Sequence, residues 1–97
     1  MAPETLNKVK AFIRISHTKL DSEISDNIAG CLADLQLHGI VYKDDTDPLI
    51  LNAVKLYCKS LYIEDPAKAA EYQRRYTSLR DSLKDAEGYG WEAEVDD

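Results

Sequence analysis

The spacing of apolar residues between positions 20 and 35 constrains the fold more than any other feature of the sequence. Steps of four, four, three and four residues separate Leu20, Ile24, Ile28, Cys31 and Leu35. Apolar residues at these intervals share one face of an α-helix, whereas a half-buried strand would alternate every second residue. We therefore predict a helix that ends near His38-Gly39. Glycine can adopt the left-handed conformation there, and the His38 side chain can lie beside the last carbonyl groups.

Two Asp-Pro pairs predict the starts of two further helices. In Asp47-Pro48 and Asp65-Pro66, the Asp side chain can cap the helix and the fixed φ of Pro suits its first turn. Apolar residues cover most of the circumference after the first pair, which predicts a central helix containing Leu49, Ile50, Ala53, Val54, Leu56, Tyr57, Cys58 and Leu61. A narrower seam follows the second pair and predicts a long, mostly exposed helix to about Gly88, with Ala69, Tyr72, Tyr76, Leu79 and Leu83 on one side.

The N-terminal segment predicts one more helix, which opens at Pro3. Its apolar stripe contains Leu6, Val9 and Ile13, with Phe12 beside it. Ser16-His17-Thr18 interrupts the pattern, and Thr18 with Asp21 approximates a capping box for the next helix. The β-prone run 40–42 has no partner strand and is expected to be an extended loop pinned to the core.

Together these signals predict an all-α fold, a small bundle of four to five helices with a long C-terminal helix. We assign residues 1–88 to this helical domain. Residues 89–97 lose all periodicity and contain four carboxylates, so we expect them to form a flexible acidic tail.

Composition narrows the classes of protein that the chain can represent. Its 97 residues suffice for one domain with a thin core, and its formal net charge of -6 disfavours wrapping by nucleic acid. The start has no basic, apolar signal sequence, and no stretch is apolar enough to span a membrane. The cysteines, Cys31 and Cys58, are far apart and form no CxxC pair, which fits a reducing cytoplasm.

Residues with catalytic or metal-binding chemistry form no convincing pattern. His17 and His38 are separated by a whole helix, and Cys31 and Cys58 occupy predicted buried positions, where a thiol is inert. The run 44–47 contains three Asp residues but lacks the Gly and Glu of a calcium loop. We read it as a solvated loop that ends in a helix cap, and we expect no catalytic residue, no metal and no cofactor.

Candidate partner-binding residues lie near the C-terminal end of the chain. The predicted last helix carries polar stripes, and the candidates on it are Arg74, Arg75, Arg80, Asp81 and Asp85. Stacking of its arginines and tyrosines on nucleic-acid bases is possible, but helix packing explains them more simply. Tyr89 and Trp91 follow the helix. They either fold back over the core as a clasp or anchor in a pocket of another protein, and the sequence leaves both open.

Several helical pieces follow one another in a recognisable order. They are Val9-Lys10, Ile13-Arg14-Ile15, Leu20-Asp21-Ser22-Glu23-Ile24, Asp47-Pro48-Leu49-Ile50, Ala53-Val54-Lys55-Leu56-Tyr57 and Tyr76-Thr77-Ser78-Leu79-Arg80-Asp81-Ser82-Leu83. Each alone is a helix-core pattern. In order, spacing and total length they resemble the tailed-bacteriophage head-to-tail connector, or adaptor, family over nearly the whole chain except its acidic end.

The resemblance implies a structural virion protein without enzyme activity. Copies would form a dodecameric ring between the portal protein and the stopper, or head-completion, protein at the DNA-packaging vertex. Assembly would take place in the host bacterial cytoplasm. The C-terminal part of such proteins typically reaches into the portal, which here would involve Tyr89 and Trp91. If acidic side chains line the ring, DNA would pass through the channel without specific binding, because like charges repel.

Other classes remain as alternatives. The first is a small helical regulator, such as an antitoxin or a transcription-factor-like domain, in which the third and fourth helices form a helix-turn-helix. Against it, the fourth helix opens with 67–71, which offers few groups to read base edges. An enzyme and a symmetric coiled-coil dimer built on the fourth helix are further alternatives.

Overall fold

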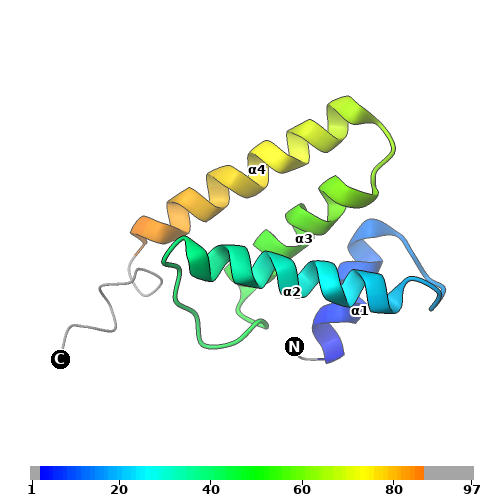
Figure 1. The fold of residues 1–97 in the computed structure, drawn as a ribbon, viewed down its shortest axis with the longest axis horizontal. Helices are drawn as coiled ribbons and strands as arrows, with labels where there is room; N and C mark the ends of the chain where they lie inside the picture. The colour runs from blue at the N-terminus through cyan, green and yellow to red at the C-terminus, as the bar shows by residue number, and fades with distance from the viewer. Residues whose placement is uncertain (1–2, 87–97) are drawn as a thin grey trace.

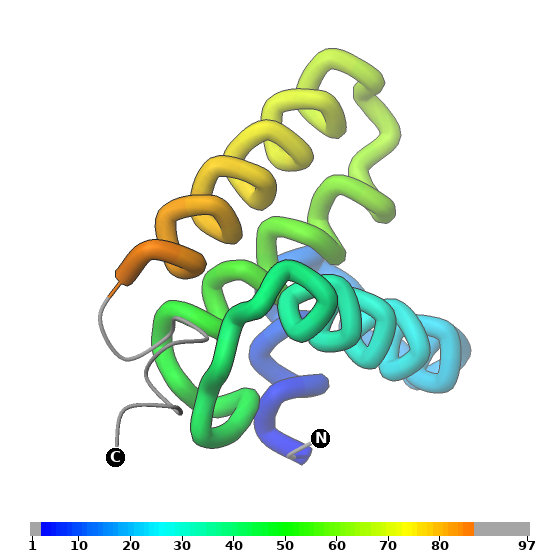
Figure 2. The backbone as a smooth tube through the Cα atoms, turned by 60° about the vertical axis from the view of Figure 1, so that its left-hand side comes forward, coloured from blue at the N-terminus to red at the C-terminus, as the bar shows by residue number. Residues whose placement is uncertain are grey.

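The computed structural model describes residues 3–86, which form four helices and no strand. They are α1 (Pro3–Ile13), α2 (Asp21–Leu37), α3 (Pro48–Tyr62) and α4 (Pro66–Asp85). Helices α3 and α4 run antiparallel and side by side, while α1 and α2 pack against α3 (Figures 1 and 2). The predicted all-α fold is confirmed, with four helices.

Helix α3 is the centre of the fold because it contacts each of the other three helices. Its residues Ile50, Ala53, Val54 and Cys58 have no exposed surface. The predicted stripe of α2 is confirmed as well, and the fully buried residues on it are Ile24, Ile28, Cys31 and Leu35. One continuous core thus lies where α1, α2 and α4 meet α3.

Helix α1 buries a slightly wider face than the predicted one. Its buried residues are Thr5, Val9 and Ile13, in steps of four, whereas Leu6 is only partly buried. Phe12 is 36% exposed. The predicted stripe is confirmed, since Leu6 also packs against the core, but packing on α3 turns the helix so that Thr5 is buried as well.

Both Asp-Pro caps are confirmed. Asp47 Oδ1 accepts hydrogen bonds from the backbone N–H groups of Leu49 and Ile50, at 3.0 and 3.4 Å. Asp65 Oδ1 caps α4 in the same way at Ala67 and Lys68, at 2.9 and 3.3 Å. Each carboxylate satisfies N–H groups that the helix itself leaves unpaired.

The predicted capping box before α2 is wrong. The N-cap residue is Leu20, and no side-chain hydrogen bond caps the helix. Thr18 contributes only its carbonyl oxygen, which accepts from Asp21 N at 3.2 Å, because a turn places it two residues outside the cap. In the loop before α3, the exposed Asp44 binds Thr46, as expected of a solvated loop, but Asp45 is buried, so the prediction was wrong at that residue.

The C-terminal end of α2 matches its prediction. Gly39 has a φ of 78°, and Ile40 N donates to Leu35 O at 3.0 Å. This is a Schellman turn, in which a left-handed residue closes the last helical carbonyl groups. The His38 ring lies beside them, with Nδ1 at 2.8 Å from Asp34 O. Ile40 is buried, so the extended loop is pinned to the core as expected.

The C-terminal end of α1 has the same geometry without glycine. Arg14 has a φ of 62°, and its N–H donates to Ala11 O at 3.3 Å. Ile15 N donates to Lys10 O at 3.0 Å, which completes a second Schellman turn. An L residue with a side chain rarely adopts this left-handed conformation.

Helix α4 ends earlier than predicted. Asp85 is its last residue and Ala86, in an extended conformation, is the C-cap. Only Tyr76 and Leu83 of this helix are buried, so the expectation that most of it is exposed is confirmed. The assigned boundary at residue 88 and the expected tail lie outside the described residues. None of the helices within residues 3–86 is long and apolar enough to cross a membrane.

Candidate functional site

The predicted polar residues of α4 separate into an inner and an outer group. Arg80 is turned inward, with only 18% of its side chain exposed, while Asp81 is 63% exposed. Arg74 and Arg75 lie nearer the start of the helix and both bind Glu71, at 2.5 and 3.1 Å. Asp85 is exposed in the last turn. The other two candidates, Tyr89 and Trp91, lie outside the described residues.

Arg80 belongs to an internal cluster that joins α2 to α4, which we call the Asp34 network and which consists of Asp34, His38, Tyr76 and Arg80. Tyr76 donates its hydroxyl to Asp34 Oδ2 at 2.6 Å, and Arg80 donates to the same oxygen at 3.2 Å. His38 Nδ1 lies 3.5 Å from the other carboxylate oxygen. The Arg80 guanidinium also stacks over the Tyr76 ring, 5.8 Å from its centroid.

Charge in the Asp34 network is balanced within the molecule. Partial burial alone would raise the pKa of Asp34, but hydrogen bonds from Tyr76 and Arg80 outweigh it and lower this pKa from 3.8. Burial and the hydrogen bond to Asp34 raise the pKa of the Tyr76 hydroxyl. The network therefore contains an ionised carboxylate with its partners in place, and it stabilises the fold.

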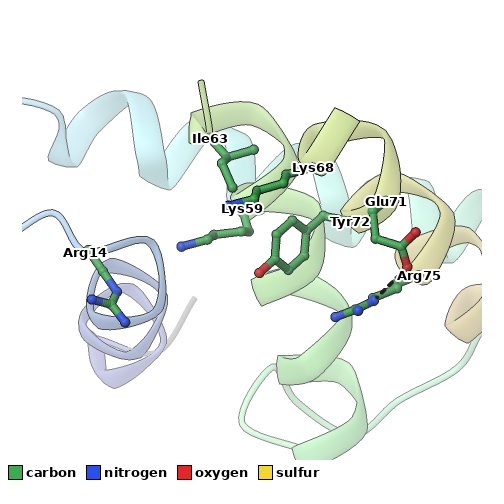
Figure 3. Close-up of a pocket in the computed structure, with 7 residues that line it drawn as sticks. All are labelled: Arg14, Lys59, Ile63, Lys68, Glu71, Tyr72 and Arg75. Atoms are coloured by element: carbon green, nitrogen blue, oxygen red, sulfur yellow. Dashed lines mark hydrogen bonds and ion pairs between the residues drawn. The ribbon is translucent and has the colours of Figure 1, made fainter. Parts of the chain in front are cut away.

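A second cluster surrounds an open cavity of about 450 Å³ at the other end of α4. We call it the basic pocket, and its lining residues are Arg14, Lys59, Ile63, Lys68, Glu71, Tyr72 and Arg75. Arg14 comes from the end of α1 and Lys59 from α3. Figure 3 shows Arg14 on one side of the cavity and Arg75 on the other, with Lys59 and Tyr72 between them.

The cations of the basic pocket outnumber its carboxylates. The single carboxylate, Glu71, is already shared by Arg74 and Arg75, whose hydrogen bonds lower its pKa. Among the described residues, Arg14, Lys59 and Lys68 have no carboxylate within ion-pair distance. The pocket thus has an excess of positive charge in a chain whose net charge is -6.

Aromatic rings form the apolar part of this surface. Tyr72 meets Phe12 edge to face, with 6.4 Å between the ring centroids. Arg75 lies over Tyr72 at 5.5 Å, and Lys55 and Lys59 lie over Phe12 at 5.9 and 5.6 Å. Lys59 also donates to Phe12 O at 3.2 Å. Cations and aromatic faces alternate here, an arrangement common at protein interfaces.

The positive surface continues beyond the pocket onto the neighbouring turns of α1 and α3, where shallow depressions beside Phe12 are lined by Lys8 and Lys55. We call the whole surface the basic face. Its cations are Lys8, Arg14, Lys55, Lys59, Lys68 and Arg75, which are six of the 12 Lys and Arg residues of the chain.

The cysteines offer no reactive thiol. Cys31 and Cys58 are free and fully buried, and burial raises the pKa of each to about 12. A thiol with this pKa is not ionised at neutral pH, and the prediction that both cysteines lie in the core is confirmed. Within residues 3–86, no group of His, Cys, Asp and Glu side chains is placed to hold a metal ion.

Sequence reasoning missed most of the basic pocket. Arg75 was a candidate, but Arg14, Lys59 and Lys68 were not, because they come from three different helices that only the tertiary fold brings together. It likewise assigned Arg80 to the surface and overlooked Asp34. One signal in the sequence could have pointed to Arg14: the first helix ends without a glycine, whereas the second ends at Gly39.

Comparison with known families agrees with this architecture. Residues 5–90 match the family model of phage connector proteins. Comparisons with curated proteins and with solved structures returned no match. The match covers all four helices apart from the first two residues of α1. The resemblance inferred from the order of the helical pieces is therefore confirmed, and the chain belongs to the phage connector protein family, a family of structural proteins.

Proposed function

We propose that this protein is a head-to-tail connector of a tailed phage and acts as a structural part without a catalytic role. Copies assemble into a dodecameric ring in the virion neck, between the portal protein and the stopper protein. The ring extends the channel for DNA and provides the surface to which the tail attaches. The observation that carries this proposal is the match of residues 5–90 to the connector family.

The basic face supports a ring rather than a symmetric dimer. A two-fold dimer presents the same patch from both copies. Six cations would then face six cations, since Glu71 is the one carboxylate in the linings of the pocket and its adjoining depressions beside Phe12. Such a face must meet a different, acidic surface. Contacts between two unlike faces are heterologous, and they close into rings when the rotation allows it.

The arrangement of α3 and α4 does not favour the helix-turn-helix regulator. A helix-turn-helix sets its two helices at roughly 90–120°. Here α3 and α4 pack antiparallel along their lengths (Figure 1), and Tyr76 of the α4 seam packs against Tyr57 of α3. Helix α4 is therefore not oriented as a recognition helix that enters a DNA groove. We therefore do not retain this alternative.

Two measurements test the proposed function. Native mass spectrometry is applied to the purified chain, alone and mixed with the purified portal protein. A species of about twelve copies should form in the isolated chain or, if not there, once the portal protein is added. In a phage with an early stop codon in this chain, electron microscopy should show DNA-filled heads and separate tails. Lys43→Glu, an exposed loop change outside the basic face, serves as the control that should still assemble.

The outcomes separate clearly. Joined virions from the stop-codon phage would rule out a connector role. A monomer that binds nucleic acid and never assembles on the portal would also contradict the proposal, and it would favour the helical regulator instead.

A further inference from the structure

Among the described residues, no carboxylate balances the charges of Arg14, Lys59 and Lys68 in the basic pocket. Arg14, Lys59 and Lys68 line one cavity, and like charges that share a cavity repel one another. Arg14 also adopts a left-handed φ of 62°, although glycine would serve the same turn without strain. A pocket that is unfavourable in the isolated chain becomes favourable when carboxylates occupy it.

The shape and lining of the pocket specify the ligand. The cavity, of about 450 Å³, combines three cations that have no carboxylate partner among the described residues with the side chains of Tyr72 and Ile63. A small inorganic anion would use the cations but leave the apolar wall unused. A peptide segment with several carboxylates and a large aromatic side chain uses both, because aromatic rings anchor in such pockets at interfaces.

We propose that the basic pocket binds the acidic segment 89–97 of a neighbouring copy, in place of the portal contact that the resemblance implies for Tyr89 and Trp91, with Trp91 against Tyr72 and the carboxylates toward Arg14, Lys59 and Lys68. This segment contains four carboxylates, two large aromatic residues and no Lys or Arg. Its chemistry is the complement of the pocket lining. The proposal rests on the proposed ring in one respect only, which is that the segment comes from another copy.

Chain length favours a neighbour over the same copy. The pocket lies at the first turns of α4, whereas the segment follows the last turn. From Tyr72 to Asp85 the helix rises about 20 Å, at 1.5 Å per residue. Residues 86–91 span at most about 20 Å when fully extended. The segment could bring its own Trp91 back only by stretching completely along α4, whereas a neighbouring copy imposes no such demand.

The pocket chemistry is tested with a peptide of residues 87–97, whose tryptophan is the only one in the sequence. The partner is the full-length chain with its own segment silenced by Trp91→Phe, Glu92→Gln, Glu94→Gln, Asp96→Asn and Asp97→Asn. Peptide tryptophan emission should shift to the blue and saturate. Lys59→Glu with Lys68→Glu should weaken binding by about tenfold or more, since two attractions become repulsions. Lys43→Glu should leave it unchanged.

Competition separates a protein ligand from a nucleic acid. A short DNA duplex at equal charge concentration should displace the peptide poorly. Two results would overturn the proposal: no saturable shift of peptide emission, or a shift that the pocket variant and the Lys43→Glu control change equally. A pocket that takes duplex but not peptide would overturn it too.

A charge-swap experiment tests whether the contact forms between copies. One full-length variant carries an acidic pocket, with Lys59→Glu and Lys68→Glu, and the other a basic segment, with Glu92→Lys and Glu94→Lys. Neither should assemble alone on the portal, but their mixture should form rings of alternating copies, seen by native mass spectrometry. Unimpaired rings from either variant alone would overturn the proposed contact and leave the connector function intact. Absence of rings from the unmodified chain would instead contradict the proposed connector function.

Discussion

The C-terminal ends of α1 and α2 solve the same structural problem with different residues. Both close with a Schellman turn, and both lie near α4. At α2 the left-handed position holds Gly39, with a φ of 78°, whereas at α1 it holds Arg14, with a φ of 62°. Beside the α2 end, Asp34 is satisfied by Tyr76 and Arg80. Beside the α1 end, Arg14, Lys59 and Lys68 have no carboxylate within ion-pair distance among the described residues.

This difference distinguishes the Asp34 network, which stabilises the chain, from the basic pocket, which we propose binds a partner. The α2 end uses the residue with the least strain and balances its charges internally. The α1 end has a strained backbone and like charges near one another, and it places the Arg14 guanidinium at the rim of an open cavity. Strain and unbalanced charge that persist in a fold commonly mark functional positions. Four substitutions test this contrast, from the largest expected effect to the smallest.

Asp34→Ala should lower the free energy of unfolding by about 2 kcal/mol, because it leaves the Tyr76 hydroxyl and the Arg80 guanidinium without the carboxylate that they share. Urea unfolding followed by circular dichroism measures the change. Asp81→Ala is the matched control, since it removes an exposed carboxylate that also contacts Arg80. Equal losses from the two variants would show that the Asp34 network contributes no more than a surface ion pair.

Gly39→Ala should destabilise the chain by about 1 kcal/mol, because a Cβ is strained at positive φ, partly offset by the lower entropy of the unfolded chain. Thermal unfolding provides the measurement. Gly30→Ala, within α2 and with the Tyr57 hydroxyl 3.9 Å from an added Cβ, should instead be neutral or stabilising. A neutral Gly39→Ala would mean that the turn can change its backbone at no cost.

Arg14→Gly should raise the free energy of unfolding by about 0.5 kcal/mol, as relief of strain exceeds the entropy that glycine adds to the unfolded chain. The same change should weaken binding of the 87–97 peptide. Arg14→Ala is the control that removes the cation but keeps the backbone strain, so it should weaken peptide binding without stabilising the fold. If Arg14→Gly left peptide binding intact, the Arg14 side chain would have no part in the pocket.

The smallest effect concerns acid pH and the Asp34 network. The folded pKa of Asp34 is below 3.8, so its ionised form adds stability that is present above the unfolded pKa and is lost as pH falls through the folded value. Asp34→Asn keeps the shape but has no charge to lose. Its unfolding free energy should therefore fall less steeply below pH 4 than that of the unmodified chain. Parallel curves would assign the acid sensitivity to other carboxylates.

The sequence by itself determined the elements of this fold. Apolar spacing located α2 and its buried face, and the Asp-Pro pairs located the starts of α3 and α4, because caps and helical periodicity are local physics within a few residues. Gly39 likewise marked the end of α2. The order of these pieces was enough to identify the connector family, since it is a property of the chain and needs no contact between distant residues.

Only the tertiary structure decided what the polar side chains do. Arg80 reads as a surface residue in the sequence, yet it lies against Asp34 from a helix 46 positions away. Arg14, Lys59 and Lys68 belong to three helices and meet only because α1 and α4 pack on α3. The sequence placed Phe12 beside the apolar stripe of α1, but only packing showed that Thr5 turns inward and that Phe12 lies at the rim. A periodic pattern fixes which residues share a face, whereas helix packing sets which distant charges face each other.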